Sequence, residues 1–279
     1  MKRLSLRRKI LISIVTILID LYCLFIFANN YNSVYYPSTS RVDLQMLLNK
    51  DQLTPHDYLQ LYYQTGLGKP AVDALIKTAD GKNRILEFQE NYFRKSKITS
   101  KKINPFTSQE SIQLTSNHLT NKSWLAPVKN GDILLTKSTQ TLFWRHGHCG
   151  IVIDAEKGIT LESLEPGSFS MIQDISRWHT YPTLKILRLK NTDDKVLNQI
   201  ANYAKSNLLG LEYSILAMKC YNKDIPKNVN CSQIIWQAYN YFGYDLDSNK
   251  GIIVTPEDIA KSPLLEVIQV KGFNPDKAW

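Results

Sequence analysis

A long apolar run near the start of the chain constrains the fold more than any other feature. Residues 1–9 contain five basic side chains, and residues 10–28 are predominantly apolar with one charge, Asp20. A run of 19 residues can cross a bilayer, and it exceeds the roughly 7–15 residues of a signal-peptide core. We therefore predict that residues 1–28 form an uncleaved membrane anchor, with a cleaved signal segment as the alternative.

The basic residues before this run also predict its orientation. Lys and Arg remain on the cytoplasmic side of a single-pass anchor, so we expect the N-terminus inside the cell and the rest of the chain outside. If the segment is cleaved, the protein is instead secreted. The net charge of +9 owes more than half to this leader, since the other 29 of the 34 basic residues face 25 acidic ones. We expect membrane contact and no nucleic-acid partner; no oligomeric state is predicted.

Composition divides the remaining chain into further segments. Thr54 and Pro55 form a typical helix start, and apolar residues with helical spacing follow them. We expect these helices to brace the main domain or to cover part of it. The predicted segments are a tether (29–42), a helical extension (43–96), a linker (97–129), a main domain (130–272) and a C-terminal tail (273–279).

The main domain is predicted to be α+β. Its short segments rich in β-branched residues are separated by connections that are too short for helical crossovers, which indicates an antiparallel sheet. Helices are expected at 193–208, from Cys231 to about residue 242, and after a capping Thr255. The expected strands lie at about 131–136, 148–155, 158–165, 168–173, 184–190 and 265–271.

Cys231 stands at the beginning of one predicted helix. It follows a turn-forming segment, 226–230, and precedes apolar residues with helical spacing that end at Gly243. The N–H groups and the positive end of the dipole at a helix N-terminus favour a thiolate and can lower its pKa from about 8.5. Cys231 is therefore a candidate nucleophile, and an inert cysteine packed under the helix start is the alternative.

His148 is the candidate base for this cysteine. It opens a predicted buried strand, and Gly147 and Gly150 on either side would let another backbone or a substrate come close. A third group that orients the imidazole would distinguish a catalytic histidine from a structural one. Glu162 and Glu165, on the next predicted strand, are the two candidates for that group.

The register of this hairpin decides which carboxylate serves. A four-residue loop at 155–158 places Glu165 across from His148. A three-residue loop or a bulge places Glu162 on the face of His148 instead, because a slip of one residue exchanges the two faces of a strand. Both alternatives stay open at this point.

The other cysteines do not suggest a disulfide framework or a metal site. Outside the predicted anchor there are three, Cys149, Cys220 and Cys231, which is an odd and sparse set. We interpret Cys149 and Cys220 as packed core residues. His146 lies nearby in sequence, but Cys149 and His148 face opposite sides of a strand and would not converge on zinc. We expect no metal and no other cofactor.

Six short motifs in a fixed order resemble the YiiX/YebB-like family. The resemblance covers about residues 128–272 and implies a circularly permuted relative of the NlpC-type cysteine hydrolases, with a papain-like fold in which the histidine strand precedes the cysteine helix. The motifs are Gly131-Asp132-Ile133, Gly147-His148-Cys149-Gly150-Ile151-Val152, Leu161-Glu162-Ser163, Gly210-Leu211-Glu212-Tyr213, Asn230-Cys231-Ser232 and Thr255-Pro256-Glu257-Asp258.

The resemblance implies roles for particular residues. It makes Cys231 the nucleophile and His148 the base, and it favours Glu162 over Glu165 as the orienting residue. Tyr213 matches a position that lines the pocket or packs in the core. Asn230 stands where many relatives carry an aromatic residue, so the chain departs from the family at the pocket wall.

The implied activity is that of an extracytoplasmic peptidase or amidase on cell-wall peptides. Within the same chemistry, an acyl-lipid or ester substrate, cleaved or transferred, is the alternative. A binding module that keeps the fold without catalysis is the second alternative. It is distinguished from an enzyme by whether Cys231 and His148 adjoin.

Overall fold

The computed structural model describes residues 5–30, 34–113, 122–142, 144–221 and 224–279. Two basic residues of the predicted leader, Lys2 and Arg3, lie outside the described residues, as do residues 31–33 of the predicted tether and residues 114–121 of the predicted linker.

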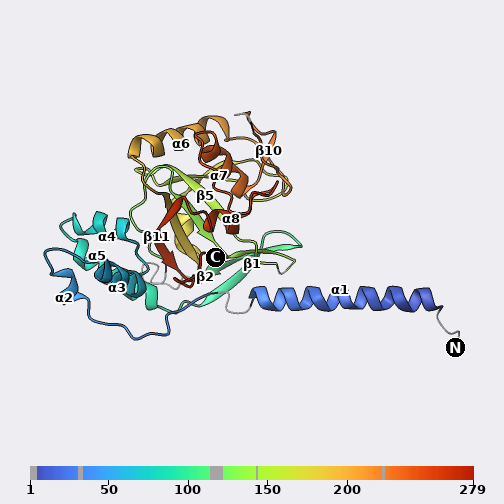
Figure 1. The fold of residues 1–279 in the computed structure, drawn as a ribbon, viewed down its shortest axis with the longest axis horizontal. Helices are drawn as coiled ribbons and strands as arrows, with labels where there is room; N and C mark the ends of the chain where they lie inside the picture. The colour runs from blue at the N-terminus through green and yellow to red at the C-terminus, as the bar shows by residue number, and fades with distance from the viewer. Residues whose placement is uncertain (1–4, 31–33, 114–121, 143, 222–223) are drawn as a thin grey trace.

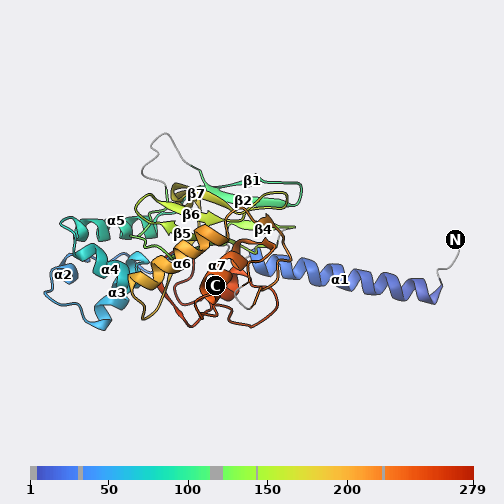
Figure 2. The same cartoon turned by 90° about the horizontal axis from the view of Figure 1, so that it is seen from above.

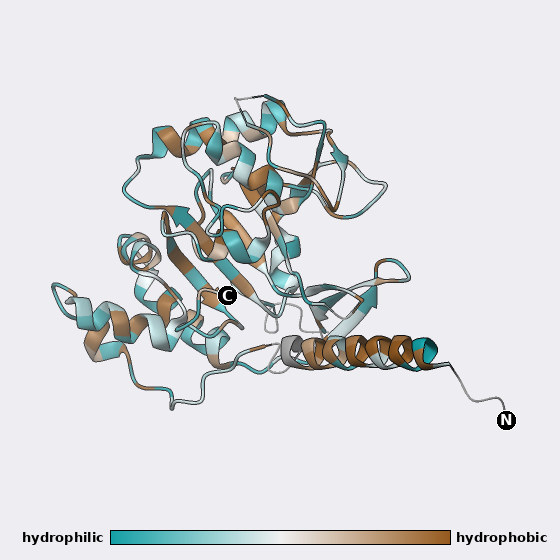
Figure 3. Cartoon of the chain, turned by 45° about the vertical axis from the view of Figure 1, so that its right-hand side comes forward, coloured by the Kyte–Doolittle hydropathy of each residue, from teal (hydrophilic) through white to brown (hydrophobic). Residues whose placement is uncertain are grey.

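The N-terminal apolar run forms one long helix, α1 (Leu6–Asn30). Its segment Leu6–Phe27 has a mean hydropathy of 2.7, and none of it is buried against the rest of the chain. Figure 1 shows α1 projecting from the folded domain, and Figure 3 shows apolar residues along its length. A helix of this length and composition can cross a membrane, and a signal segment satisfies the same test.

A six-stranded antiparallel sheet forms the centre of the domain, which confirms the predicted α+β class. In spatial order its strands are β11 (Leu265–Lys271), β8 (Leu184–Leu189), β3 (Ile133–Thr136), β5 (His148–Asp154), β6 (Ile159–Glu162) and β7 (Met171–Asp174).

Alternation along the strands gives the sheet two apolar faces, each covered by helices. In β5, Cys149 and Ile151 belong to one core and Val152 belongs to the other. Successive side chains of a strand point to opposite faces of the sheet, so apolar residues at consecutive positions indicate that both faces are buried. The result is three layers, with the sheet between two groups of helices (Figure 1).

The first face carries three helices from the second half of the chain. Asp193, Asn230 and Thr255 cap them, each accepting a hydrogen bond from a backbone N–H of the first turn. These caps fix where each helix begins, so Cys231 is the first helical residue. The helices are α6 (Asp194–Asn207), α7 (Cys231–Asn240) and α8 (Pro256–Ala260).

The opposite face carries the predicted helical extension. Thr54 and Asp57 form a reciprocal capping box at one of its helices, as the Thr-Pro start suggests. The layer packs on Leu134, Ile186 and Ile268 of the sheet, which fits a brace for the sheet. Its helices are α2 (Gln45–Leu48), α3 (Pro55–Thr65), α4 (Lys69–Ile76) and α5 (Gly81–Phe93).

The segment predicted as a linker contains regular structure that the sequence did not indicate. It holds an antiparallel hairpin, whose second strand pairs with a short strand from the main domain. Figure 2 shows this small sheet beside the main sheet, near the base of α1. Its strands are β1 (Ile98–Lys102), β2 (Thr107–Ile112) and β4 (Thr139–Thr141).

The last part of that segment is built into the domain. The Gln269 side chain accepts a hydrogen bond from the N–H of Ala126 at 2.6 Å and donates one to the carbonyl of Trp124 at 2.6 Å. The C-terminal tail also packs on the sheet, since Lys185 Nζ of β8 donates to the carbonyls of Lys277 at 3.0 Å and Ala278 at 2.6 Å. The domain therefore extends beyond the predicted 130–272 core on both sides.

Three short elements complete the fold near α7. They are β9 (Glu212–Tyr213), which pairs in parallel with β10 (Asn228–Val229), and the 3₁₀ helix η1 (Ile175–Thr180). The elements β9 and β10 hold the loop that leads into Cys231. The helix η1 places Trp178, which is fully buried, beneath the sheet.

Candidate active site

A β-bulge sets the register of the hairpin that carries His148. Ile151 pairs with Leu161 and Val152 pairs with Thr160, but the register shifts before Asp154 pairs with Ile159. The extra residue places Glu162 on the face of His148, which is the bulge alternative of the sequence prediction. Because β6 ends at Glu162, the first residues of β5 extend beyond it.

Glu162 is held on both of its oxygens. Its Oε2 lies 2.7 Å from His148 Nε2, and its Oε1 accepts hydrogen bonds from Thr160 Oγ1 at 2.6 Å and Trp178 Nε1 at 2.8 Å. Burial raises the pKa of Glu162, but these hydrogen bonds and the charge of His148 outweigh it and lower the pKa overall. Glu162 is therefore an ionised acceptor that fixes the imidazole.

Gly150 leaves the room that the carboxylate needs. A Cβ at this position would lie 2.8 Å from Glu162 Cγ and 3.3 Å from Trp178 Cζ2. The ring of Trp178 also stacks on His148, with centroids 5.7 Å apart. The sequence predicted that another backbone or a substrate would approach this glycine, whereas the structure places the side chains of Glu162 and Trp178 there.

Cys231 meets His148 at the start of α7. The Asn230 side chain accepts hydrogen bonds from Gln233 N at 2.8 Å and Ser232 Oγ at 3.0 Å, which anchors the first turn. His148 also forms a hydrogen bond with Cys231. Because Glu162 occupies Nε2 of the ring, Nδ1 is the nitrogen that is left for this hydrogen bond. The two candidate residues, 83 positions apart in the sequence, thus adjoin.

The electrostatics favour an ion pair. Burial disfavours charge on His148, but hydrogen bonds to Cys231 and Glu162 outweigh it and raise the pKa of His148 to about 9. A hydrogen bond with the Cys149 thiol is the largest effect on Cys231; with His148 it overcomes burial and brings the pKa of Cys231 well below its ordinary value. These two shifts favour the ion pair of a thiolate and an imidazolium over the two neutral groups.

Cys149 has a role in this site that sequence reasoning missed. It is fully buried, as predicted for a core residue, and burial raises its pKa well above the ordinary value. Its thiol therefore stays protonated and donates to the Cys231 sulfur, and its backbone N–H donates as well. Strand alternation directs Cys149 toward the α7 face, so the position of α7 was the missing signal.

The remaining predicted residues are Glu165, Tyr213 and Asn230, and they differ in how they relate to Cys231 and His148. Glu165 lies beyond the end of β6, where its carbonyl accepts a hydrogen bond from Ser168 Oγ, and its side chain does not hold the His148 ring. Tyr213 lies close enough that burial and the charge of Cys231 raise its pKa. Asn230 lies next to the sulfur as the helix cap.

Two further residues near the site were not predicted to act there. Trp178 carried no sequence signal, because it lies in a 3₁₀ helix that belongs to neither the His148 motif nor the Cys231 motif. The His146 ring forms a hydrogen bond with Thr141 Oγ1 at 2.9 Å. Burial lowers the pKa of His146, and the charge of Cys231 acts in the opposite direction.

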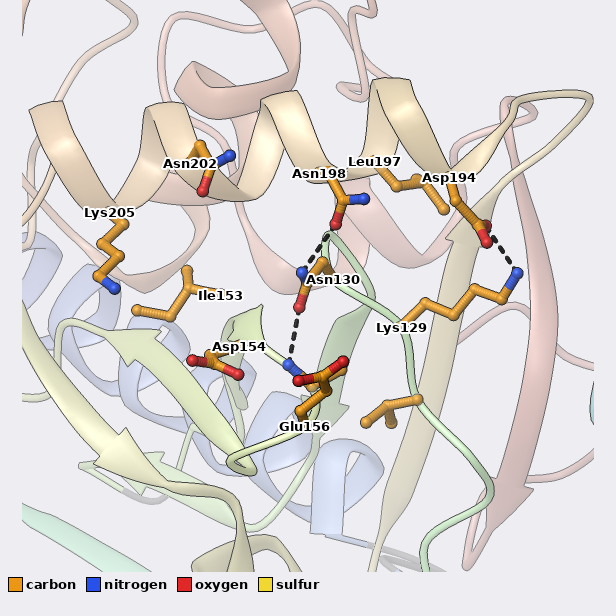
Figure 4. Close-up of a pocket in the computed structure, with 12 residues that line it drawn as sticks. Lys129, Asn130, Ile153, Asp154, Glu156, Asp194, Leu197, Asn198, Asn202 and Lys205 are labelled. Carbon is orange, nitrogen blue, oxygen red and sulfur yellow. Dashed lines mark hydrogen bonds and ion pairs between the residues drawn. The ribbon is translucent and has the colours of Figure 1, made fainter.

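Within the described ranges, no group of three or more His, Cys, Asp or Glu side chains is arranged to hold a metal ion. A polar hollow lies elsewhere, between the β5–β6 hairpin and α6 (Figure 4). Asn130 spans it, donating to Asn198 Oδ1 at 2.7 Å and accepting from Ala155 N at 2.7 Å. None of the candidate catalytic residues lines this hollow.

Comparisons with known proteins find little similarity. No protein-family model matches the chain, and no curated protein matches it. The fold is similar to the crystal structure of metalloprotein YiiX from Escherichia coli O157:H7, with 16% identity and a TM-score of 0.41. That likeness covers 52% of this chain and 98% of the other. Because both the identity and the TM-score are low, the chain is not assigned to a family.

Proposed function

We propose that this protein is a cysteine hydrolase in which Cys231 is the nucleophile, His148 the acid and base, and Glu162 the orienting residue. The observation that carries the proposal is the hydrogen-bonded series from Glu162 through His148 to Cys231. A nucleophile, a base and a third group that orients the base form the arrangement that covalent catalysis requires. The motif order supports a circularly permuted papain-like origin for the domain.

The proposed reaction begins with the thiolate of Cys231. Its sulfur attacks a carbonyl carbon and forms a tetrahedral adduct. His148, as imidazolium, then donates its proton to the leaving amine or alcohol as the carbon–heteroatom bond breaks. A water molecule, deprotonated by the now neutral His148, cleaves the thioester, which releases the acid product and restores the thiolate of Cys231 and the imidazolium of His148. Glu162 holds the ring and stabilises its charged form throughout.

Backbone N–H groups at the start of α7 are the proposed donors to the oxyanion. They include that of Cys231, and the N-terminal end of the helix dipole adds to their effect. In other enzymes, removal of one such donor costs about 3–4 kcal/mol of transition-state stabilisation. The Asn230 cap keeps this turn in place.

The proposed substrate is a cell-wall peptide amide, and α1 is proposed to anchor the domain outside the cell with the N-terminus inside. An acyl ester is the second candidate. Ile215, whose side chain is exposed, is tied through its carbonyl to Asn230 Nδ2 at 3.5 Å, and exposed Leu216 follows it. An apolar rim beside the nucleophile suits an acyl chain.

Incubation of the full chain with muropeptides and, separately, with acyl lipids tests the proposal. The wild type releases a product from one of these classes, and Cys231→Ala releases none. Thiol labelling provides a second measurement, since Cys231 reacts rapidly at neutral pH and His148→Ala slows that reaction. Slow labelling of the wild type, with no product from either class, would favour a binding module instead.

A further inference from the structure

The small sheet ends in a group of exposed apolar side chains, which we call the apolar tip: Ile103, Phe106, Leu142 and Trp144. The last three are 66%, 52% and 43% exposed. A hydrogen bond from Leu142 N to Phe106 O, at 2.8 Å, joins the β1–β2 loop to the turn after β4. Exposed apolar residues from two separate loops therefore lie at the same end of this sheet.

The backbone of Leu142 adopts a conformation that is costly for a leucine. Its φ of 48° lies in the left-handed region, which is uncommon for a bulky residue. Glycine or asparagine would occupy this turn position at lower cost. An exposed leucine in the left-handed region is a costly choice for this turn, so its apolar side chain calls for an explanation.

The apolar tip touches α1 inside its membrane-spanning segment. Tyr22 Oη donates a hydrogen bond to the carbonyl of Leu142 at 2.8 Å. Tyr22 lies five residues before Phe27, where the span ends, which corresponds to about 7.5 Å along the helix axis at 1.5 Å per residue. Figures 1 and 2 both show the small sheet beside the domain-proximal end of α1.

We infer that the apolar tip inserts into the interfacial layer of the same bilayer that α1 crosses. If α1 spans the membrane, the hydrogen bond between Tyr22 and Leu142 places Leu142 inside the bilayer, short of the end of the span. This is the depth at which acyl chains meet headgroups. Tyr and Trp favour this layer because their rings are apolar at one side and polar at the other. The domain therefore has two membrane contacts, α1 and the apolar tip.

A rigid connection links the apolar tip to the candidate active site. Arg145, one residue after Trp144, is buried and makes a two-pronged ion pair with Glu110 of β2, at 2.6 and 2.7 Å. His146 follows and bonds Thr141 Oγ1, and His148 is two residues further on. Insertion of the tip thus fixes the orientation of the Cys231 site relative to the bilayer.

This inference requires α1 to lie in the bilayer, but it does not require Cys231 to be catalytic. Quenching of tryptophan fluorescence by brominated lipids tests it, with the full chain reconstituted in vesicles of phosphatidylcholine and phosphatidylglycerol brominated at shallow acyl positions. Trp178 and Trp236 are fully buried and Trp124 and Trp279 are partly buried, whereas Trp144 is exposed. We expect lipid-dependent quenching of the wild type and loss of most of it in Trp144→Phe.

A second variant separates insertion from a local effect on the fluorophore. Phe106→Asp/Leu142→Asp keeps Trp144 and should remove most of the lipid-dependent quenching, because two carboxylates oppose entry into the acyl layer. Met46→Asp is the matched control, since Met46 is 85% exposed on α2, and it should quench like the wild type. Circular dichroism checks that all variants fold.

Two results would overturn the inference. The first is wild-type quenching that Trp144→Phe leaves unchanged, which would assign it to another tryptophan. The second is the absence of lipid-dependent quenching in a chain that co-floats with the vesicles and resists carbonate extraction, which would show that α1 inserts without the tip. A chain that carbonate extracts would refute it as well, because α1 would not be in the bilayer.

Discussion

At the scale of single residues, the site depends on which groups surround one sulfur atom. The largest effect on the pKa of Cys231 comes from Cys149, a residue that strand alternation directs away from His148. The imidazole and this second thiol therefore reach the sulfur from different faces of β5. Neither group is replaceable by the other, because only the imidazole can carry a proton to and from a substrate near neutral pH.

The pH dependence of thiol labelling follows from this arrangement. In the wild type, the alkylation rate of Cys231 by iodoacetamide should already be high at pH 7, since its pKa lies well below the ordinary value. In His148→Ala the midpoint of the rate should move to higher pH, because the partner charge and hydrogen bond are lost. Mass spectrometry of the labelled peptide between pH 5 and 10 gives both curves, and superimposable curves would contradict the ion pair.

Cys149→Ala should also raise the pH midpoint of Cys231 labelling. The substitution removes the thiol donor that most favours the thiolate, while the backbone N–H of residue 149 still donates. Cys220→Ala is the matched control, because Cys220 is not among the groups that lower the pKa of Cys231. A midpoint equal to that of the control would show that the second thiol has no effect.

Gly150→Ala should reduce both stability and the labelling rate of Cys231. The new methyl group would lie 2.8 Å from Glu162 Cγ, and overpacking of a buried site costs about 1–3 kcal/mol. Displacement of the carboxylate also loosens the His148 ring. Urea unfolding measures the first effect. Because Gly150 is not among the glycines of positive φ, the loss of stability reports the crowding of the added Cβ. A wild-type labelling rate in Gly150→Ala would contradict the proposed crowding.

At the scale of elements, boundaries set by local chemistry were predictable, and those set by tertiary pairing were not. The last strand lies at 265–271, as predicted, and the capping box at Thr54 begins its helix as predicted. The bulge between Val152 and Asp154 had no sequence signal, so the register alone did not decide whether Glu162 or Glu165 faces His148. The β1–β2 hairpin was missed because its strands are largely polar and only partly buried.

The first turn of α7 offers a test at this scale. Asn230→Ala removes the side chain that accepts from Gln233 N, and loss of such a cap costs about 1 kcal/mol. The free energy of unfolding in urea should fall by that amount, and the labelling of Cys231 should slow as the turn loosens. Asn230→Asp retains an accepting oxygen and should restore stability. Equal losses in both variants would show that the cap is not the cause.

At the scale of the whole molecule, a buried lysine joins the sheet to the helical brace. Lys271 Nζ donates to Asn91 Oδ1 at 2.8 Å, and burial lowers the pKa of Lys271 to about 7. Its pKa in the unfolded chain is about 10.4, so the unfolded state binds more protons between these values. Stability from this group therefore rises with pH through that window.

Comparison with Lys271→Met isolates this effect from other titrating groups. The difference in free energy of unfolding, wild type minus variant, should increase between pH 7 and pH 9. His148 contributes in the opposite direction as pH approaches about 9, but it is present in both proteins and cancels. A difference that is constant with pH would mean that Lys271 titrates normally in the folded chain.

The burial of Glu162 has a consequence for the order in which a reagent meets the three side chains. Glu162 is inaccessible to solvent and His148 is 4% exposed, whereas Cys231 is partly exposed. An incoming molecule therefore meets Cys231 before it can approach the carboxylate of Glu162. Selection at this entrance can therefore depend on how electrophilic a molecule is and how well it fits, with little direct repulsion of anions by the sealed carboxylate.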